Sequence, residues 1–135
     1  MYRGRASIRF STALDPELPR LDLDREQIKR VILNLIDNGI HAIDTAGPGP
    51  REIHLQTSFD REFGVVRLEI QDTGVGIAGE ERLRIFQPDY STREGGTGIG
   101  LAIVARIISD HSGTIRVQPN KPRGSRFVGE IPVRA

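Results

Sequence analysis

The chain has 135 residues, which is enough for one domain with a single hydrophobic core. Nineteen basic residues nearly balance 18 acidic ones, so a polybasic nucleic-acid arm and an acidic disordered tail are both excluded. The absence of cysteine excludes a disulfide framework and a thiolate zinc site, and the aromatic content of 5% disfavours base-stacking platforms.

The first third of the chain predicts one strand and one long helix. Alternating apolar residues predict a short strand over residues 6–10, and a Pro- and Asp-rich loop follows over 14–23. Asp24 is a residue type that caps helices, and apolar residues at helical spacing continue from it to about residues 42–44. The sequence Ala-Gly-Pro-Gly-Pro at 46–50 ends this helix.

The middle of the chain predicts a hairpin followed by less regular structure. Alternation over residues 52–59 and 64–71 predicts two strands joined by a turn. A short helix is expected over 79–86. Residues 87–96 have no periodicity and are expected to form a loop.

The last third of the chain predicts a helix and two strands. Residues 99–110 are apolar on nearly all sides, which predicts a buried helix, and 114–118 and 126–133 alternate as strands. The apolar part of that helix is far too short to cross a bilayer. Because helices and strands mix without strict alternation, the fold class is α+β, with helices on one face of a mixed or mostly antiparallel sheet.

A polar face on the long helix is the first candidate site. Asn34, Asp37, Asn38 and His41 follow at spacings of i, i+3, i+4 and i+7, so they share one helix face. Amide oxygens can ligate Mg²⁺ without adding charge, and an imidazole can reach a phosphate. A solvated helix face is the alternative reading, which we favour for Asp37.

Asp72 ends the second strand of the hairpin with the parity of that strand's apolar residues, so it is expected to face the core. A buried carboxylate needs hydrogen-bond donors. Backbone N–H groups of the following glycine turn could supply them. The exocyclic amino group of a bound base could also supply them, with Gly74 and Gly76 letting the ring approach.

Seven of the 15 glycines lie between Gly74 and Gly100, and several of them open the apolar helix. Exposed N–H groups and the positive helix dipole at such a terminus suit phosphates. The segment lacks the Gly-Lys-Ser/Thr ending of a P-loop and does not follow a strand as a dinucleotide fingerprint would. Ser125 is expected to face inward, either as a water-mediated contact to a base or as a core serine.

Five segments occur in an order and spacing that resembles a known family. They are Asn34-Leu-Ile-Asp-Asn38, Asp72-Thr-Gly-Val-Gly76, Ile85-Phe-Gln-Pro88, Gly96-Thr-Gly-Ile-Gly100 and Gly124-Ser-Arg-Phe127. They resemble the five boxes of the catalytic ATP-binding domain of sensor histidine kinases, which belongs to the gyrase, Hsp90, histidine kinase and MutL group. The sequence is most similar to the nitrogen-regulation subgroup. The resemblance implies a Bergerat fold, a two-layer α/β sandwich with about three helices on one face of a mostly antiparallel sheet.

The resemblance also implies a role for each matching residue. Asn38 would ligate the Mg²⁺ that bridges the phosphates of ATP, Asn34 would assist one turn earlier, and His41 would lie near the phosphates. Asp72 would accept the adenine amino group. The other residues expected around the nucleotide are Gly74, Gly76, Ile77, Phe86, Arg93, Gly96, Thr97, Gly98, Ile99, Gly100, Leu101 and Ser125.

Residues 87–96 would form a mobile lid over the nucleotide in this family. The sequence departs from the family pattern at a few positions. Gly39 stands where Ala is usual, which should weaken the helix by up to ~1 kcal/mol. Arg93 stands where Lys is common, and Ser125 stands where Thr is usual.

Asn34 separates the subclasses of this fold. In gyrase-like ATPases and in serine kinases of the fold that this sequence resembles, a Glu stands at the position of Asn34 and acts as the general base. The amide of Asn34 cannot take a proton. Neutral imidazole is already a nucleophile, so Asn34 favours phosphoryl transfer to histidine. A free-standing serine kinase or ATPase, and a degenerate docking module that needs no nucleotide, are the alternatives.

The three histidines His41, His54 and His111 do not match a phosphoacceptor site. The chain is therefore interpreted as a single catalytic domain over 1–135, with the dimerisation domain expected before Met1. The resemblance implies ATP and ADP, that dimerisation domain and a response regulator as partners, without nucleic acid or direct membrane contact. It further implies a monomeric fragment of a homodimeric kinase, located in the cytoplasm and tethered to a membrane in some full-length kinases.

Overall fold

The computed structural model describes residues 7–87 and 100–133, and every statement below refers to these residues. They form one five-stranded sheet with the strand order β1-β2-β3-β5-β4. The strands are β1 (Arg9–Ala13), β2 (Glu52–Asp60), β3 (Val65–Asp72), β4 (Thr114–Pro119) and β5 (Ser125–Pro132). β1 pairs with β2 in parallel, and the other neighbours pair antiparallel. The predicted mixed, mostly antiparallel sheet is confirmed.

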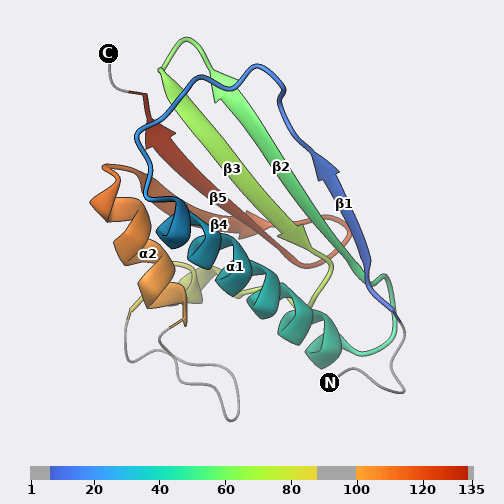
Figure 1. The fold of residues 1–135 in the computed structure, drawn as a ribbon. Helices are drawn as coiled ribbons and strands as arrows, with labels where there is room; N and C mark the ends of the chain where they lie inside the picture. Colours follow the sequence, from blue (N-terminus) through green and yellow to red (C-terminus); the bar gives the residue numbers. More distant parts are fainter. Residues whose placement is uncertain (1–6, 88–99, 134–135) are drawn as a thin grey trace.

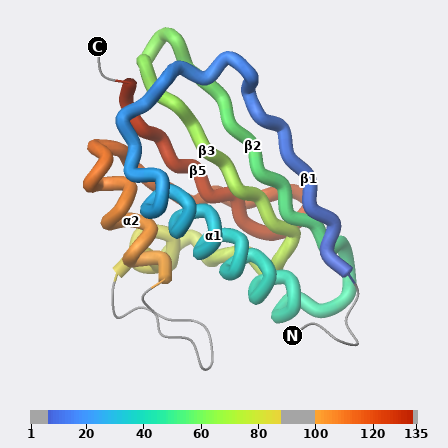
Figure 2. The backbone as a smooth tube through the Cα atoms, in the orientation of Figure 1, coloured from blue at the N-terminus to red at the C-terminus, as the bar shows by residue number. Residues whose placement is uncertain are grey.

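Two α-helices, α1 (Arg25–Ala46) and α2 (Gly100–Asp110), cover one face of this sheet (Figure 1). The tube view shows them side by side, with α1 running roughly along the direction of the strands behind it (Figure 2). α1 begins where its sequence predicted, because the Asp24 side chain accepts a hydrogen bond from the backbone N–H of Gln27 at 3.2 Å. Its buried residues Val31, Leu35 and Ile43 form the stripe that faces the sheet.

The expected short helix over 79–86 is present but shorter, as a 3-10 helix, η1 (Gly79–Glu81). Together with the two α-helices it makes up the helices of the described residues, in agreement with the fold class expected from the sequence. Ile85 is buried but Leu83 is 90% exposed, so the segment has no continuous apolar stripe to hold a longer helix against the sheet.

Two further expectations need correction. The first strand covers 9–13 and not 6–10, because its register is set by pairing with β2, where Phe10 lies opposite Ile53. α2 is not buried on all sides, because it lies on α1 and the sheet with one face only. Val104, Ile107 and Ile108 are buried, whereas Arg106 is exposed.

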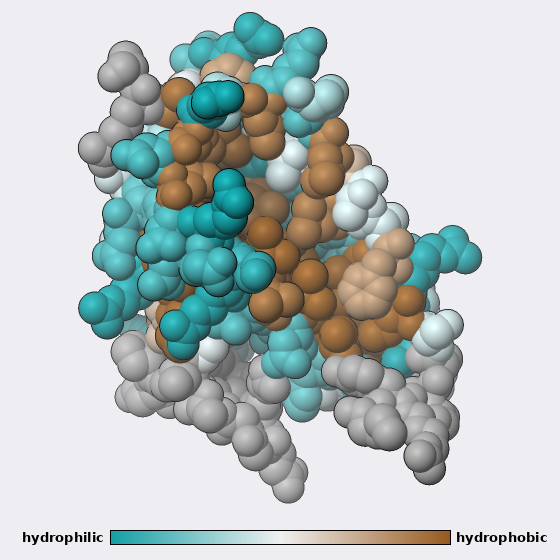
Figure 3. All heavy atoms as spheres, viewed as in Figure 1, coloured by the Kyte–Doolittle hydropathy of each residue, from teal (hydrophilic) through white to brown (hydrophobic). Residues whose placement is uncertain are grey.

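The core lies between the helices and the sheet, with each fully buried aliphatic side chain contributing about 1.5–3 kcal/mol. Its members from the strands include Ile53, Ile70 and Phe127. Apolar side chains remain visible at the surface beside α1, on the side toward β1 (Figure 3). Among the described residues, no helix is long and apolar enough to span a membrane.

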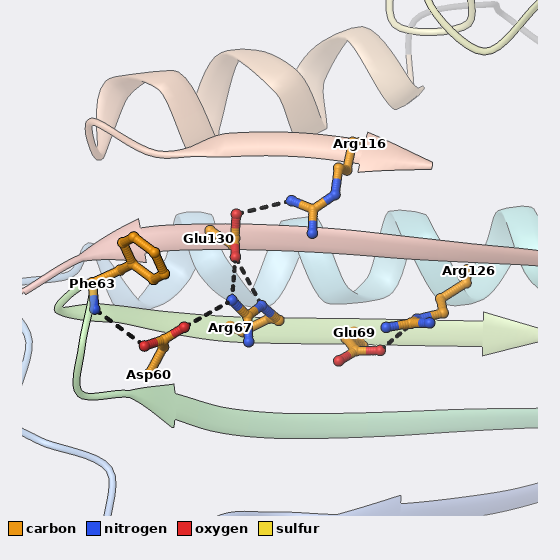
Figure 4. Close-up of polar contacts among 7 residues, drawn as sticks. All are labelled: Asp60, Phe63, Arg67, Glu69, Arg116, Arg126 and Glu130. Atoms are coloured by element: carbon orange, nitrogen blue, oxygen red, sulfur yellow. Dashed lines mark hydrogen bonds and ion pairs between the residues drawn. The ribbon is translucent and has the colours of Figure 1, made fainter. Parts of the chain in front are cut away.

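The opposite face of the sheet carries a network of ion pairs instead of helices (Figure 4). Arg67 on β3 pairs with Glu130 on β5 at 2.6 Å and with Asp60 on β2 at 3.5 Å. Glu130 also accepts a hydrogen bond from Arg116 on β4 at 2.8 Å. These charges cross four neighbouring strands, and the long side chains substitute for a second layer.

Candidate nucleotide site

Asp72 is the centre of the candidate site. It is the last residue of β3, and its side chain is only 1% exposed, so the predicted inward orientation is confirmed. Its Oδ1 accepts hydrogen bonds from the backbone N–H of Gly74 at 2.8 Å and of Ser125 at 3.3 Å. Burial raises the pKa of Asp72 to about 6, although these two hydrogen bonds act to lower it. Backbone groups therefore supply donors to one carboxylate oxygen, as the glycine-turn reading expected.

The other oxygen of Asp72 lies beneath α1. A methyl group added at Gly39 would lie 3.2 Å from Asp72 Cβ and 3.7 Å from Asp72 Oδ2. Gly39 is buried, and it directly follows the expected metal ligand Asn38 on α1. Tertiary packing therefore places the Asp72 carboxylate against the buried stripe of α1, one residue along the chain from Asn38.

Gly74 fits where no other residue would. A Cβ at this position would lie 2.5 Å from Ala42 Cβ and 2.6 Å from its carbonyl carbon. The next residue, Val75, donates its N–H to the Ala42 carbonyl at 3.1 Å. Gly74 is therefore required by the close approach of α1, a reason that the sequence pattern did not reveal.

Asn34 connects the two helices. Its Nδ2 donates a hydrogen bond to the Gly100 carbonyl in the first turn of α2, at 3.2 Å. Asn34, Asn38 and His41 are all half-buried on one face of α1, whereas Asp37 is exposed on the surface of the helix. The predicted grouping of these three side chains on one face of α1 is therefore consistent with the structure.

The remaining predicted residues fall into three groups. Ile77 and Phe86 are half-buried and pack against the core, where the ring of Phe86 meets that of Phe127 edge to face at 6.2 Å. Gly100 and Leu101 are half-buried in the first turn of α2, and Gly76 lies in the turn after β3 with a φ of 81°. Five predicted residues lie outside the described residues: Arg93, Gly96, Thr97, Gly98 and Ile99.

Ser125 is 3% exposed, as its parity predicted, but its contact with Asp72 uses the backbone N–H. The sequence reasoning missed Asn120 and Arg123, which precede Ser125 in the turn between β4 and β5. Asn120 Nδ2 donates to the Asp72 carbonyl at 2.8 Å, and Arg123 Nε donates to the Thr73 carbonyl at 2.7 Å. A turn rich in Lys, Pro, Arg and Gly gives no local signal that its side chains reach another strand.

A divalent metal would find amide oxygen at this site. Within residues 7–87 and 100–133, no group of three or more His, Cys, Asp or Glu side chains could hold a metal ion. The half-buried amide of Asn38 suits a hard cation that takes its remaining ligands from phosphate oxygens and water. The donor set fits a Mg²⁺ ion that arrives with a nucleotide.

Comparison with known proteins places this geometry in a family. Residues 23–135 match the model described as "Histidine kinase-, DNA gyrase B-, and HSP90-like ATPase". The chain is 36% identical over 129 residues to the signal transduction histidine-protein kinase AtoS of Escherichia coli (strain K12), covering 96% of this chain and 20% of AtoS. It is 34% identical over 134 residues to the sensory histidine kinase/phosphatase NtrB of Salmonella typhimurium, covering 95% of this chain and 38% of NtrB.

Solved structures agree with this match. The catalytic domain of histidine kinase ThkA superposes with a TM-score of 0.78 at 34% identity, covering 93% of this chain and 79% of that one. Full-length ShkA in complex with AMPPNP gives a TM-score of 0.79 at 29% identity, over 95% of this chain and 26% of that one. ThkA has also been solved in complex with the response regulator protein TrrA, with a TM-score of 0.72 at 32% identity, over 94% of this chain and 34% of that one.

The chain therefore belongs to the family of histidine kinase-, DNA gyrase B- and HSP90-like ATPases, and its relatives are sensor histidine kinases. The resemblance to the kinase ATP-binding domain and the expected Bergerat fold are confirmed. A nitrogen-regulation kinase is among the relatives. The chain spans between a fifth and two fifths of the length of these two relatives.

Proposed function

We propose that this domain binds Mg·ATP and donates the γ-phosphoryl group to a histidine of a separate dimerisation domain in a two-component sensor kinase. The observation that carries the proposal is the buried carboxylate of Asp72, held at the end of β3 directly beneath the asparagine-bearing helix α1. ATP binding is the family's shared property, and the neighbour ShkA was solved with the ATP analogue AMPPNP.

The nucleotide would lie along α1. Asp72 approaches α1 at Gly39, and the first turn of α2 approaches it at Asn34. Five residues of helix separate these contacts by about 8 Å. A nucleotide whose adenine amino group reaches Asp72 would extend its phosphates toward Asn34, Asn38 and the N-terminus of α2, whose dipole favours anions.

Asn34 supports histidine as the acceptor. Its amide donates to the Gly100 carbonyl, which a carboxylate at this position could not do. It cannot serve as the general base that water or a serine hydroxyl would need. A neutral histidine needs no such base, so the domain would act by orienting the triphosphate and neutralising its charge.

The acceptor histidine would come from another domain. His54 contacts the Ser11 hydroxyl at 2.7 Å on the sheet, and His111 accepts the Asp24 N–H at 3.0 Å at the end of α2. His41 lies on α1 within the proposed site. We accordingly propose a dimerisation domain that precedes this domain in a homodimeric kinase and a response regulator as the next acceptor. The domain alone would be monomeric and would act in the cytoplasm without touching membrane or nucleic acid.

Calorimetry of Mg·ADP and Mg·ATP binding tests the site. Asp72→Asn turns a hydrogen-bond acceptor for the adenine amino group into an amide, and we expect affinity to fall about tenfold to hundredfold. Asn38→Asp adds negative charge beside the phosphates, so Mg²⁺ should no longer tighten binding. Asp110→Asn, at an exposed carboxylate at the C-terminal end of α2, is the matched control. Unchanged binding in both test variants would refute the site, and no binding by the unaltered chain at millimolar nucleotide would favour a docking module.

Phosphotransfer separates the remaining alternative. With labelled ATP, we expect acid-labile phosphate to form on a dimerisation domain supplied in trans and not on this chain alone. Rapid ATP hydrolysis by the chain alone, or acid-stable phosphate on a serine, would favour the ATPase or serine kinase reading.

A further inference from the structure

The turn between β4 and β5 forms hydrogen bonds with the end of β3, at the residue proposed to recognise adenine. Asn120 Nδ2 donates to the Asp72 carbonyl at 2.8 Å, and Arg123 Nε donates to the Thr73 carbonyl at 2.7 Å. The N–H of Ser125, at the end of the same turn, donates to Asp72 Oδ1 at 3.3 Å. One turn therefore holds both the backbone and the carboxylate of Asp72.

Arg123 extends this contact to a third segment. Its Nη1 donates to the Pro48 carbonyl at 2.9 Å, and its Nη2 donates to the Pro50 carbonyl at 3.3 Å. Both carbonyls belong to the connection between α1 and β2. Thr73 Oγ1 donates to the same Pro50 carbonyl at 2.8 Å, so the contacts form a closed network.

Only a guanidinium can make these contacts together. Its planar fork presents donors in fixed directions, and Arg123 uses three of its nitrogens on three carbonyls. A lysine has one nitrogen on a flexible stem and could satisfy one or two of the carbonyls. Arg123 is half-buried, and its hydrogen bond to the Thr73 carbonyl is partly buried, whereas its two hydrogen bonds to the Pro48 and Pro50 carbonyls lie at the surface.

The backbone of the turn is shaped for this approach. Gly124 has a φ of 109°, and a Cβ there would lie 1.9 Å from the Asp72 carbonyl oxygen. Gly124 thus lets the turn rest directly on the peptide that follows Asp72. The contact of Arg123 is part of close packing between two segments that are 50 residues apart in the chain.

Recognition of a base depends on the placement of the carboxylate. Asp72 is 1% exposed and Thr73 is 7% exposed, so even a small shift of the backbone there would push against packed neighbouring groups. A misplacement of about 1 Å in a binding group can cost up to about 100-fold in function. We propose that Arg123 is a positioning residue for adenine recognition, which fixes the Asp72–Thr73 peptide so that the carboxylate meets the exocyclic amino group. This inference rests on the proposed function.

The test compares ADP with inosine diphosphate, which lacks the exocyclic amino group. Both are titrated by calorimetry with Mg²⁺ into the unaltered chain and into Arg123→Met, Arg123→Lys and Arg116→Met. Arg116 lies on β4 and binds Glu130 on the far face of the sheet, so Arg116→Met is the matched control. Thermal unfolding of each variant measures any general loss of structure.

We expect Arg123→Met to weaken ADP about tenfold while the affinity for inosine diphosphate changes less than twofold, because one specific hydrogen bond is lost. Arg123→Lys should give an intermediate loss, and Arg116→Met should leave both affinities unchanged. Equal weakening of both nucleotides, or no weakening of ADP, overturns the positioning role. If Arg123→Met does not fold, Arg123→Lys decides by the same comparison. Failure of the unaltered chain to distinguish the two nucleotides instead overturns base recognition by Asp72, and the inference with it.

Discussion

Asp72 and Glu130 lie on neighbouring strands of one sheet, yet the two carboxylates are held in opposite ways. Glu130 faces the open side, where Arg67 and Arg116 donate hydrogen bonds that lower its pKa. Asp72 faces the helices, where burial raises its pKa to about 6 against two backbone hydrogen bonds. Neighbouring cations thus stabilise the charged form of Glu130, whereas burial makes the charged form of Asp72 unfavourable. A carboxylate with such a raised pKa is typical of a ligand-binding site.

The difference also concerns how closely the chain packs around each acid. At Asp72, α1 and the β4–β5 turn approach so closely that Gly74 and Gly124 leave no space for a side chain. At Glu130, long arginine side chains fill the space and can rearrange. We therefore expect substitutions beside Asp72 to have larger effects on stability and ADP binding than substitutions in the network of ion pairs around Glu130.

The largest effect is expected from Gly74→Ala. The new methyl group would lie 2.5 Å from Ala42 Cβ, so α1 must move away from β3, and the free energy of unfolding should fall by about 3 kcal/mol. Urea unfolding measures this change. Gly79→Ala is the matched control, because a Cβ there meets nothing within 4 Å and should change stability by less than about 1 kcal/mol. Equal stability of the two variants would contradict the close approach.

A gain in stability is expected from Asp72→Asn. The folded pKa of about 6 lies above the ordinary value of 3.8, so the native state binds more protons than the unfolded state between these values. Stability of the unaltered chain should therefore fall as pH rises from about 4 to about 6. Removing the charge should recover about 1–3 kcal/mol at pH 7 and flatten that pH dependence.

Unfolding curves at several pH values measure this prediction, with adenine nucleotide absent. The same variant should bind ADP poorly, so stability and binding would change in opposite directions. A variant that is less stable than the unaltered chain at pH 7 would show that the Asp72 charge is well satisfied in the native state.

The smallest effect is expected from Glu130→Gln. The pKa of Glu130 is lowered in the fold, so its contribution to stability is present above the ordinary value of 4.5 and is lost as pH falls below it. The pair is partly exposed, and replacement by Gln should cost about 1 kcal/mol at pH 7 with little change in ADP affinity. Chemical unfolding and calorimetry measure the two quantities, and a marked loss of ADP binding would contradict the separation of the two faces.

Local patterns predicted the regular elements well. The Asp24 cap, the stripe of α1 and the hairpin of β2 and β3 follow from residues close together in sequence. The position of β1 does not follow from its local sequence, because pairing with β2 sets its register. The extent of η1 does not follow either, because the segment around it buries too few apolar side chains to hold a longer helix. Ser125 shows a partial success, since its parity was correct but its backbone makes the contact.

Backbone periodicity is enough to place Asp72 at the inward-facing end of a strand and to put Asn34, Asn38 and His41 on one helix face, so both features can be predicted from the sequence. The passage of α1 over Asp72 at Gly39, and the contact of Arg123 with Thr73 from 50 residues away, could be known from the folded molecule alone. Such contacts depend on how the layers pack, and a charged residue in a turn has the same local sequence whether it meets solvent or a buried carbonyl.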